Sequence, residues 1–268
     1  MTTDSADNIL EVRDLKVHFP IKKGVFGRTT GYVRAVDGVS FVVRRGETLG
    51  VVGESGCGKS TTSRAILGLN KPCGGEILFE GVSLRKMSVL ERARAIQVVF
   101  QDPMASLNPR HTIREILTEG MIYHGLCTKA DSRERATALL RDVGLSQTIL
   151  DRYPHEFSGG QRQRICIARA IALRPRLLIC DEAVSALDLS IRAQVLDLLA
   201  ELKRKLDLSI LFITHDIGVV QHVADRIIVM NRGRIVEQGT CADVLGSPKD
   251  AYTKNLMAAV PKIGKPLV

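Results

Sequence analysis

The chain has 268 residues, of which 45% are hydrophobic and 25% are charged, and these values are typical of a globular protein with one large or two closely packed domains. No apolar run approaches the roughly 18 to 20 residues that cross a bilayer, and the polar N-terminus does not resemble a signal peptide, so we expect a cytosolic protein. The formal net charge is +9, but the basic residues are dispersed and aromatic residues make up only 4% of the chain. This pattern argues against direct binding of nucleic acid.

The six cysteines lie far apart, with no Cys-x-x-Cys pair and no histidine at the spacing of a metal site. We expect them to be reduced and mostly buried as small hydrophobic side chains. They are Cys57, Cys73, Cys127, Cys166, Cys180 and Cys241.

The first part of the chain predicts two strands. Residues 9–19 alternate between apolar and polar side chains, as in a half-buried strand, and Pro20 is expected to end it. Residues 22–31 are basic and contain glycine, which predicts a loop, and residues 33–43 predict a second strand with a turn at Asp37-Gly38. A further turn at 44–47 leads into the next element.

Residues 48–62 combine a short apolar strand, a glycine-punctuated loop and the start of a helix. Gly53, followed after four residues by Gly58-Lys59-Ser60, is the Walker A pattern of nucleoside triphosphate binding. Glycines let successive N–H groups point at phosphate oxygens, Lys59 brings a positive charge to the β and γ phosphates, and the Ser60 hydroxyl suits Mg²⁺. The predicted nucleotide-binding residues are Gly53, Glu54, Ser55, Gly56, Cys57, Gly58, Lys59, Ser60 and Thr61.

The aromatic side chains near this loop have two interpretations. Phe19, Phe26 or Tyr32 either stacks on an adenine or packs into the core.

After the phosphate-loop helix, expected to end near Leu69, the pattern predicts a short strand at 76–81, a helix at 89–95 and a strand at 96–101 that ends in Gln101. Residues 102–109 contain two prolines and predict a loop. Residues 113–150 are helical in pattern and more polar, which indicates an inserted helical lobe.

A second glycine-containing helix start follows this lobe. Ser158, Gly159, Gly160 and Gln161 open a helix expected to run to Leu173. A hydroxyl and backbone N–H groups at a helix start predict a second anion site.

The remaining elements alternate between strands and helices. An apolar strand at 177–182 ends in Asp181 and Glu182, and a strand at 209–214 precedes His215. Helices are expected at 190–206 and 216–224, a hairpin at 227–237, and short helices at 242–245 and 252–259. Apolar strands alternating with helices predict an α/β protein with a buried, mainly parallel sheet.

Four of the predicted strands end at polar residues: Gly53, Gln101, Asp181 and His215. Ligands of such sheets bind at the carboxyl ends of the strands, so we expect these residues to share one crevice. Asp181 is placed to hold Mg²⁺, directly or through water, and Glu182 to polarise an attacking water. Gln101 would orient that water or contact Mg²⁺, and His215 would bond the γ-phosphate; the candidate Mg²⁺ ligands are Ser60, Gln101 and Asp181.

One chain thus carries two phosphate-binding surfaces, and a single-site GTPase would not need the second. We therefore predict that the Ser158–Gln161 surface of one copy closes on the nucleotide held by another copy, so that ATP joins a head-to-tail dimer.

Residues 8–260 resemble the ATP-binding-cassette (ABC) ATPases, whose motifs occur in this chain in the family's order. They are Walker A at 53–60, the Q-loop Gln101, the signature at 157–161, Walker B at 177–181 with Glu182, the D-loop at 185–188 ending in Asp188, and the switch His215. The resemblance implies a P-loop core with a mixed, mainly parallel sheet, an antiparallel β subdomain, and a helical subdomain at about 102–157 that receives a membrane subunit. It also implies that Glu182 is the catalytic base, that His215 senses the γ-phosphate, and that Ser158 and Gly160 contact ATP in trans.

The chain is most similar to ATPases of dipeptide, oligopeptide and nickel importers, in particular to the second of their two ATPase subunits. The similarity is carried by residues 35–41, 53–60, 100–110 and the short tail at 241–268, with Ser247-Pro248 before Ala251-Tyr252. It implies two membrane permease subunits, a second similar ATPase subunit or a second copy of this chain, a solute-binding protein, and a peripheral location at the cytoplasmic face of the bacterial inner membrane.

The chain departs from the family pattern at three places: Phe157 replaces a leucine of the signature, Ala183 replaces a proline after Glu182, and Asp250-Ala251 replaces His-Pro in the tail. The cysteine-containing extension of some relatives is missing, so no iron–sulfur cluster is expected. Two alternatives stay open. One is a soluble ABC ATPase that acts on nucleic acid or the ribosome, although this sequence shows no coiled coil, zinc module or second cassette of the kind such proteins carry. The other is an exporter subunit.

Overall fold

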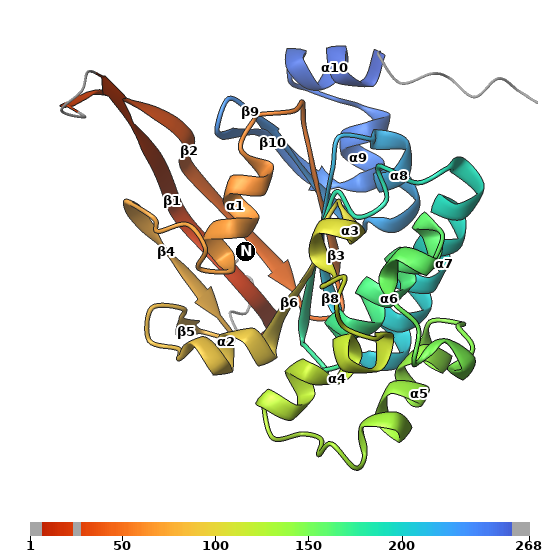
Figure 1. Cartoon of the computed structure of the whole chain (residues 1–268). Coiled ribbons are helices and arrows are strands. Elements are labelled where there is room, and N and C mark those ends of the chain that lie inside the picture. The colour runs from red at the N-terminus through yellow and green to blue at the C-terminus, as the bar shows by residue number, and fades with distance from the viewer. Residues whose placement is uncertain (1–6, 24–27, 259–268) are drawn as a thin grey trace, which may run out of the picture.

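Two β-sheets, with helix α1 (Lys59–Ile66) packed between them, form the framework of the protein (Figure 1). The computed structural model describes residues 7–23 and 28–258. The first sheet is antiparallel, in the order β2-β1-β4-β5, with bounds β1 Asn8–Lys23, β2 Arg28–Arg44, β4 Gly74–Phe79 and β5 Val82–Ser83.

The second sheet has the order β10-β9-β3-β8-β7-β6 and is parallel except for β10. Its strands are β3 Thr48–Val52, β6 Ile96–Val99, β7 Leu177–Asp181, β8 Ser209–Thr214, β9 Arg226–Asn231 and β10 Arg234–Thr240. The predicted α/β class with a mainly parallel sheet and an antiparallel sheet is confirmed.

Helices connect many of these strands, and the last two helices follow β10. The helices are α1 Lys59–Ile66, α2 Val89–Ala95, α3 Pro103–Ser106, α4 Ile113–Tyr123, α5 Ser132–Asp142, α6 Gly159–Ile171, α7 Leu189–Leu206, α8 Ile217–Val223, α9 Cys241–Gly246 and α10 Ala251–Ala258, with single 3₁₀ turns at Gln147–Ile149 and Pro154–Glu156. Within residues 7–23 and 28–258, none of them combines the length and apolar character that a bilayer crossing needs.

The parallel sheet is covered on both faces, which explains why its strands are continuous apolar runs. Every residue of β3, β7 and β8 is buried. Leu49 and Val51 face a core shared with α1 and the antiparallel sheet, whereas Val52 faces the core under α6 to α8. Gly50 is required by close packing, since a Cβ there would lie 2.6 Å from Cγ1 of Val220 on α8.

The helices between β6 and α6 form a lobe that packs against α6 (Figure 1). Ile113 and Leu117 of α4 and Leu140 of α5 are buried in the same core as α6. This lobe was predicted as helical, and α5 is followed by Gly144, which has the left-handed conformation at φ +70° that is common after the end of a helix.

The antiparallel hairpin departs from the prediction in two ways. Pro20 does not end β1, and the described residues of the expected loop, 22–23 and 28–31, are strand, because β1 and β2 stay paired to Lys23 and Arg28. Residues 24–27 of that loop lie outside the described part of the chain. Beyond Lys16, β1 has β2 as its only partner strand among the described residues, and a proline is tolerated on such an edge. Asp37-Gly38 is not a turn, because β2 continues through it and Gly38, at φ +83°, is the extra residue of a bulge.

Other differences are small. Helix α1 ends at Ile66, three residues before the predicted Leu69, and β6 ends at Val99, before Gln101. The expected loop at 102–109 contains α3, whose start has a recognisable signal: the Asp102 carboxylate accepts from the N–H groups of Met104 and Ala105, and Pro103 occupies the first turn.

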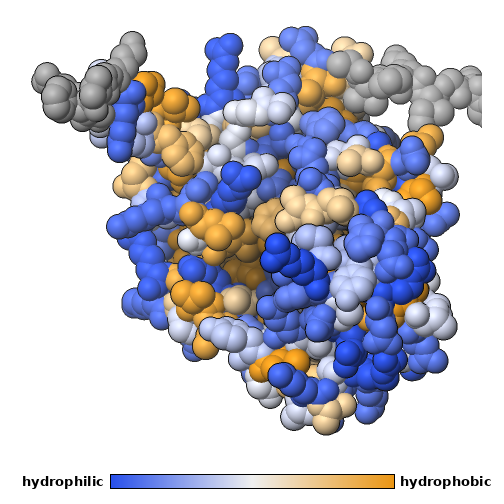
Figure 2. Space-filling model, in the orientation of Figure 1, coloured by the Kyte–Doolittle hydropathy of each residue, from blue (hydrophilic) through white to orange (hydrophobic). Residues whose placement is uncertain are grey.

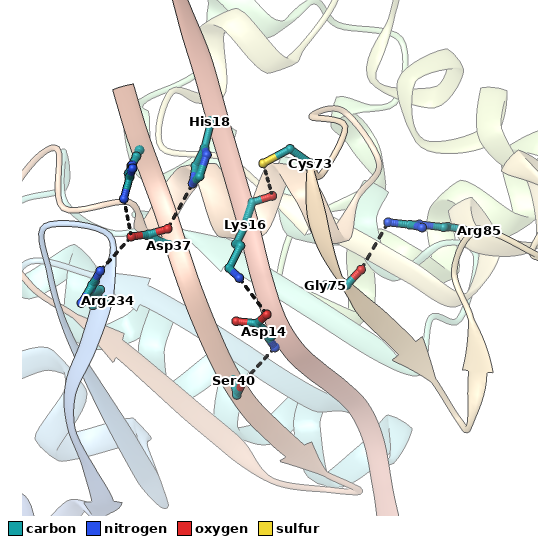
Figure 3. Close-up of polar contacts among 10 residues, drawn as sticks. Asp14, Lys16, His18, Asp37, Ser40, Cys73, Gly75, Arg85 and Arg234 are labelled. Atoms are coloured by element: carbon teal, nitrogen blue, oxygen red, sulfur yellow. Dashed lines mark hydrogen bonds and ion pairs between the residues drawn. The ribbon is translucent and has the colours of Figure 1, made fainter. Parts of the chain in front are cut away.

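Asp37 joins the two sheets through its carboxylate (Figure 3). This side chain is 14% exposed and accepts hydrogen bonds from Arg234 of β10, at 2.9 Å, and His18 of β1, at 3.2 Å. Arg34 of β2 lies 3.7 Å away. The Arg234 hydrogen bond, together with that of His18, holds the pKa of the Asp37 carboxyl below its ordinary value of 3.8 despite partial desolvation.

We therefore expect Asp37→Asn to lower the melting temperature at neutral pH. A depressed pKa contributes stability that is present above the unfolded value of 3.8 and is lost as the pH falls through the folded value, so the difference between wild type and variant should shrink below pH 3.8. Thermal melts from pH 7 to pH 3 measure it, with Asp197→Asn on the exposed surface of α7 as control. A difference that is constant over this range would contradict the prediction.

Candidate nucleotide-binding and catalytic site

The loop between β3 and α1 is pressed between two neighbouring segments. Gly53 has φ +152°, and a Cβ there would collide with the carbonyl oxygen of Met230 at the end of β9. Gly58 has φ +110°, and its Cβ would collide with the carbonyl oxygen of Ala35 in β2. Both glycines are therefore required by backbone packing as well as by loop conformation.

Lys59 at the start of α1 is 4% exposed, and its ammonium is bound by the loop itself. Its Nζ donates to the carbonyl oxygens of Gly53, at 2.7 Å, and Glu54, at 2.9 Å. A buried ammonium needs such partners, so the positive charge is fixed against the phosphate loop. Burial raises the pKa of the neighbouring Cys57 thiol, which keeps it neutral at physiological pH.

Asp181 at the end of β7 is buried and bound by two hydroxyls of α1. Oγ of Ser60 donates to Oδ1 and Oγ of Ser63 donates to Oδ2, both at 2.9 Å. The Walker B carboxylate is thus tied directly to the helix that follows the phosphate loop. Ser63 was not among the predicted site residues, although its spacing of three from Ser60 on one helix was a usable signal.

Glu182 and His215 face each other across neighbouring strand ends. Oε2 of Glu182 lies 3.3 Å from Nδ1 of His215. Glu182 is left-handed at φ +53°, an uncommon and strained conformation, and its N–H donates to the carbonyl oxygen of Ile213 at 2.9 Å. The backbone of Glu182 is therefore held by β8, the strand that His215 directly follows.

Gln101 shares a cleft of about 530 Å³ with Ser60 and Asp181. All three predicted metal-binding residues thus line the same cleft. Arg64 of α1 and Arg169 of α6 also line it, so the cleft combines oxygen ligands with positive charge.

The signature residues lie at the start of α6. Ser158 is its N-cap: its N–H donates to Oε1 of Gln161 at 3.1 Å, and its hydroxyl accepts from the Gln161 N–H at 3.4 Å. A Cβ on Gly160 would lie 2.5 Å from the Ile191 side chain of α7. Among the hydrogen bonds of the described residues, none joins Ser158, Gly159, Gly160 or Gln161 to the loop at 53–61, so the two predicted anion sites are not linked within one chain.

The D-loop residue Asp188 is exposed and precedes Leu189, whose side chain is 80% exposed. Arg192 of α7 connects this segment to the switch: it donates to the carbonyl oxygen of Leu187 at 3.3 Å and to the carboxylate of Asp216 at 2.7 Å. The D-loop is thereby joined to the residue that follows His215.

The candidate adenine-stacking aromatics lie on the hairpin. Phe19 of β1 is 42% exposed and Tyr32 of β2 is 62% exposed, so neither is packed into the core. Phe26 lies outside the described residues.

Two of the residues that differ from the family pattern, Phe157 and Ala183, are buried. The Phe157 ring lies beneath the Arg152 guanidinium, with 4.7 Å between its centre and Cζ of Arg152. The cysteines are free and mostly buried, as predicted.

Residues 36–185 match the family model described as ABC transporter. The chain belongs to this family. Two curated relatives match over nearly its whole length: the oligopeptide transport ATP-binding protein AppF of Bacillus subtilis is 49% identical over 97% of this chain and 80% of its own, and OppF of Salmonella typhimurium is 52% identical over 94% of this chain and 78% of its own.

The ABC fold is also found in a solved structure of a dimeric ATP-binding cassette, described as a post-hydrolysis state bound to ADP and Pi. That cassette is 27% identical, with a TM-score of 0.76, over 87% of this chain and 98% of its own. The family predicted from the motifs is therefore confirmed.

The pairing of Ser63 with Asp181 leads to a prediction for this ABC cassette. Ser63→Ala would leave a buried carboxylate oxygen without its donor, so we expect a loss of about 1–3 kcal/mol in the free energy of unfolding. Denaturant titration measures it, with Ser83→Ala in β5 as control. A loss no larger than that of the control would contradict the role of Ser63 as a support for Asp181.

Proposed function

We propose that this chain is the ATP-hydrolysing subunit of an ABC importer for peptides. The observation that carries the proposal is the arrangement at the strand ends: Asp181 tied to α1, beside the pair of Glu182 and His215. The relatives AppF and OppF, named as oligopeptide transport proteins, support peptides as the cargo.

ATP binds with its phosphates in the loop at 53–61. The loop's N–H groups and the N-terminal end of α1 face the phosphate oxygens, and the Lys59 ammonium keeps its bond to the Gly53 carbonyl while its other N–H donors turn to the β and γ oxygens. The exposed hairpin aromatics Phe19 and Tyr32 are the candidates for stacking on adenine.

Mg²⁺ fits the oxygen groups of the cleft. The Ser60 hydroxyl, the Asp181 carboxylate and the Gln101 amide oxygen are hard ligands on one surface, which suits an ion that prefers oxygen and keeps several waters. When bound, Mg²⁺ would neutralise charge developing on the transferred phosphate.

Hydrolysis follows from the Glu182 carboxylate. Water attacks the γ-phosphorus, its proton passes to Glu182, and the bond to the β-phosphate oxygen breaks to give ADP and inorganic phosphate. His215 bonds the γ-phosphate, and its contact with Glu182 supports a role for both groups at the same reacting atoms. Gln101 orients the water or contacts the metal.

The second half of each site comes from another subunit. Ser158, Gly159, Gly160 and Gln161 have no bond to the loop of their own chain, and Asp188 and Leu189 are exposed beside them. A head-to-tail pair would place this surface on the nucleotide of the partner, which is a second copy or a similar ATPase subunit. The dimeric cassette with ADP and Pi supports this arrangement.

Two permease subunits would dock on the face that carries the helical segment at 102–157. Figure 2 shows hydrophobic residues around a hollow on this side of the molecule. A recess of about 290 Å³ lies there between the end of α1, α2 and β6, and it is lined mainly by apolar side chains such as Leu67, Leu69, Val89 and Phe100. We propose that residues 8–260 form one cassette and that a short tail begins at residue 241. The cassette would lie at the cytoplasmic face of the bacterial inner membrane, in a complex that includes a solute-binding protein. It would not bind nucleic acid directly.

Glu182→Gln tests the chemistry. The variant keeps the phosphate loop but loses the base, so ATP and Mg²⁺ should hold a closed dimer while hydrolysis falls by about 100-fold or more. Light scattering with and without Mg-ATP measures the dimer, with Glu201→Gln on the surface of α7 as control. Turnover within a few fold of wild type would contradict the assignment of Glu182.

Reconstitution tests the transport function. Vesicles that contain this chain with its membrane and solute-binding subunits should accumulate labelled oligopeptide when Mg-ATP is supplied on the cassette side, and Lys59→Ala should abolish both accumulation and hydrolysis. Hydrolysis without peptide accumulation would contradict the importer function. Salt-sensitive binding of DNA or ribosomes by the chain would instead support a soluble ABC ATPase.

A further inference from the structure

The C-terminal helix reaches back to the phosphate loop. In Figure 1, α10 lies above α9, at the end of the molecule where the loop between β3 and α1 rises. The hydroxyl of Tyr252 in α10 accepts a hydrogen bond from the backbone N–H of Glu54 at 3.0 Å. A residue from near the end of the chain thus contacts the second residue of the Walker A pattern.

This bond acts on the peptide group that holds Lys59. The N–H of Glu54 and the carbonyl of Gly53 belong to the same planar peptide unit, and the two groups point in opposite directions. Tyr252 binds the N–H side, while the Lys59 ammonium binds the carbonyl side at 2.7 Å. Rotation of this peptide would break both bonds, so Tyr252 fixes the carbonyl to which Lys59 is bound.

Tyr252 is itself fixed by a series of hydrogen bonds that begins at the Glu237 side chain of β10. The Glu237 carboxylate accepts from the N–H groups of Lys249, at 2.8 Å, and Asp250, at 3.2 Å. The Asp250 carboxylate accepts in turn from the Tyr252 N–H at 2.8 Å. The tyrosine ring is partly buried against the core under α8 and α9, so its hydroxyl is presented from a supported position.

We propose that Tyr252 is a positioning residue for ATP, which orients the 53–54 peptide and through it the ammonium of Lys59. The proposal rests on the proposed function of the loop as the phosphate site. Pre-ordering a binding loop lowers the free energy that the ligand must spend on ordering it, so the bond should strengthen ATP binding. Because Tyr252→Phe leaves both Lys59 and Glu182 in the site and removes only the ordering of the peptide before ATP binds, turnover of bound ATP should change little.

The contribution of the hydroxyl to the loop can be separated from a contribution to overall stability. The Glu54 N–H lies at an exposed position, so water can replace the hydroxyl when it is removed and no buried group is left unpaired. Tyr252→Phe keeps the ring and its packing. Its effect should therefore be confined to the phosphate loop, with little change in the melting temperature.

The experiment compares wild type with Tyr252→Phe in the full chain, and uses Tyr123→Phe, an exposed tyrosine of α4, as matched control. Mg-ATP titration should give a dissociation constant raised about three- to tenfold, and steady-state hydrolysis should show the same rise in KM with kcat within about twofold. Amide hydrogen exchange should become faster at Glu54 in the variant and stay unchanged in α7.

An unchanged dissociation constant together with unchanged exchange at Glu54 would overturn the proposal. A fall in kcat with no change in KM would also overturn it. If wild type itself did not bind Mg-ATP, the proposed function would fail, and that outcome is distinct from binding by wild type and variant with equal affinity.

Discussion

A buried carboxylate at the end of β7 determines how the parts of this site lie relative to each other. Asp181 cannot be left unpaired in the interior, and its two partners, Ser60 and Ser63, both come from α1. Because α1 begins at the phosphate loop, this pairing fixes the loop relative to the strand end that carries Glu182. The antiparallel sheet covers the other side of α1, so packing as well as hydrogen bonding holds the helix beside the carboxylate.

Much of this arrangement could be predicted from the sequence. Continuous apolar strands indicated a sheet covered on both faces, and the carboxyl ends of parallel strands meet at one edge, which brought Gln101, Asp181 and Ser60 to one cleft. The glycines at 53 and 58 indicated a tight loop, and the structure adds the reason for their size, because the carbonyl oxygens of Met230 and Ala35 occupy the space of a side chain.

The remaining features depend on contacts that local pattern does not encode. Pro20 stops a strand in most contexts, but here it lies where β1 has a single neighbour, and only the pairing of the strands reveals this. Asp37-Gly38 likewise has the sequence of a turn but forms a bulge, because β2 continues to pair with β1 on both sides of it. The hydrogen bond from the Glu54 N–H to the Tyr252 hydroxyl joins residues far apart in sequence, and no periodicity predicts it.

The order of strands in the parallel sheet has a consequence for how the chain reaches its native state. β3 carries the phosphate loop, yet its two neighbours are β8 and β9, which are synthesised much later. The apolar strand β3 therefore stays unpaired during synthesis until β8 and β9 have been made. Such non-local pairing forms slowly, and the unpaired strand is prone to associate with other chains. The sheet that positions the phosphate loop is thus completed only after β9, which ends at Asn231, has emerged.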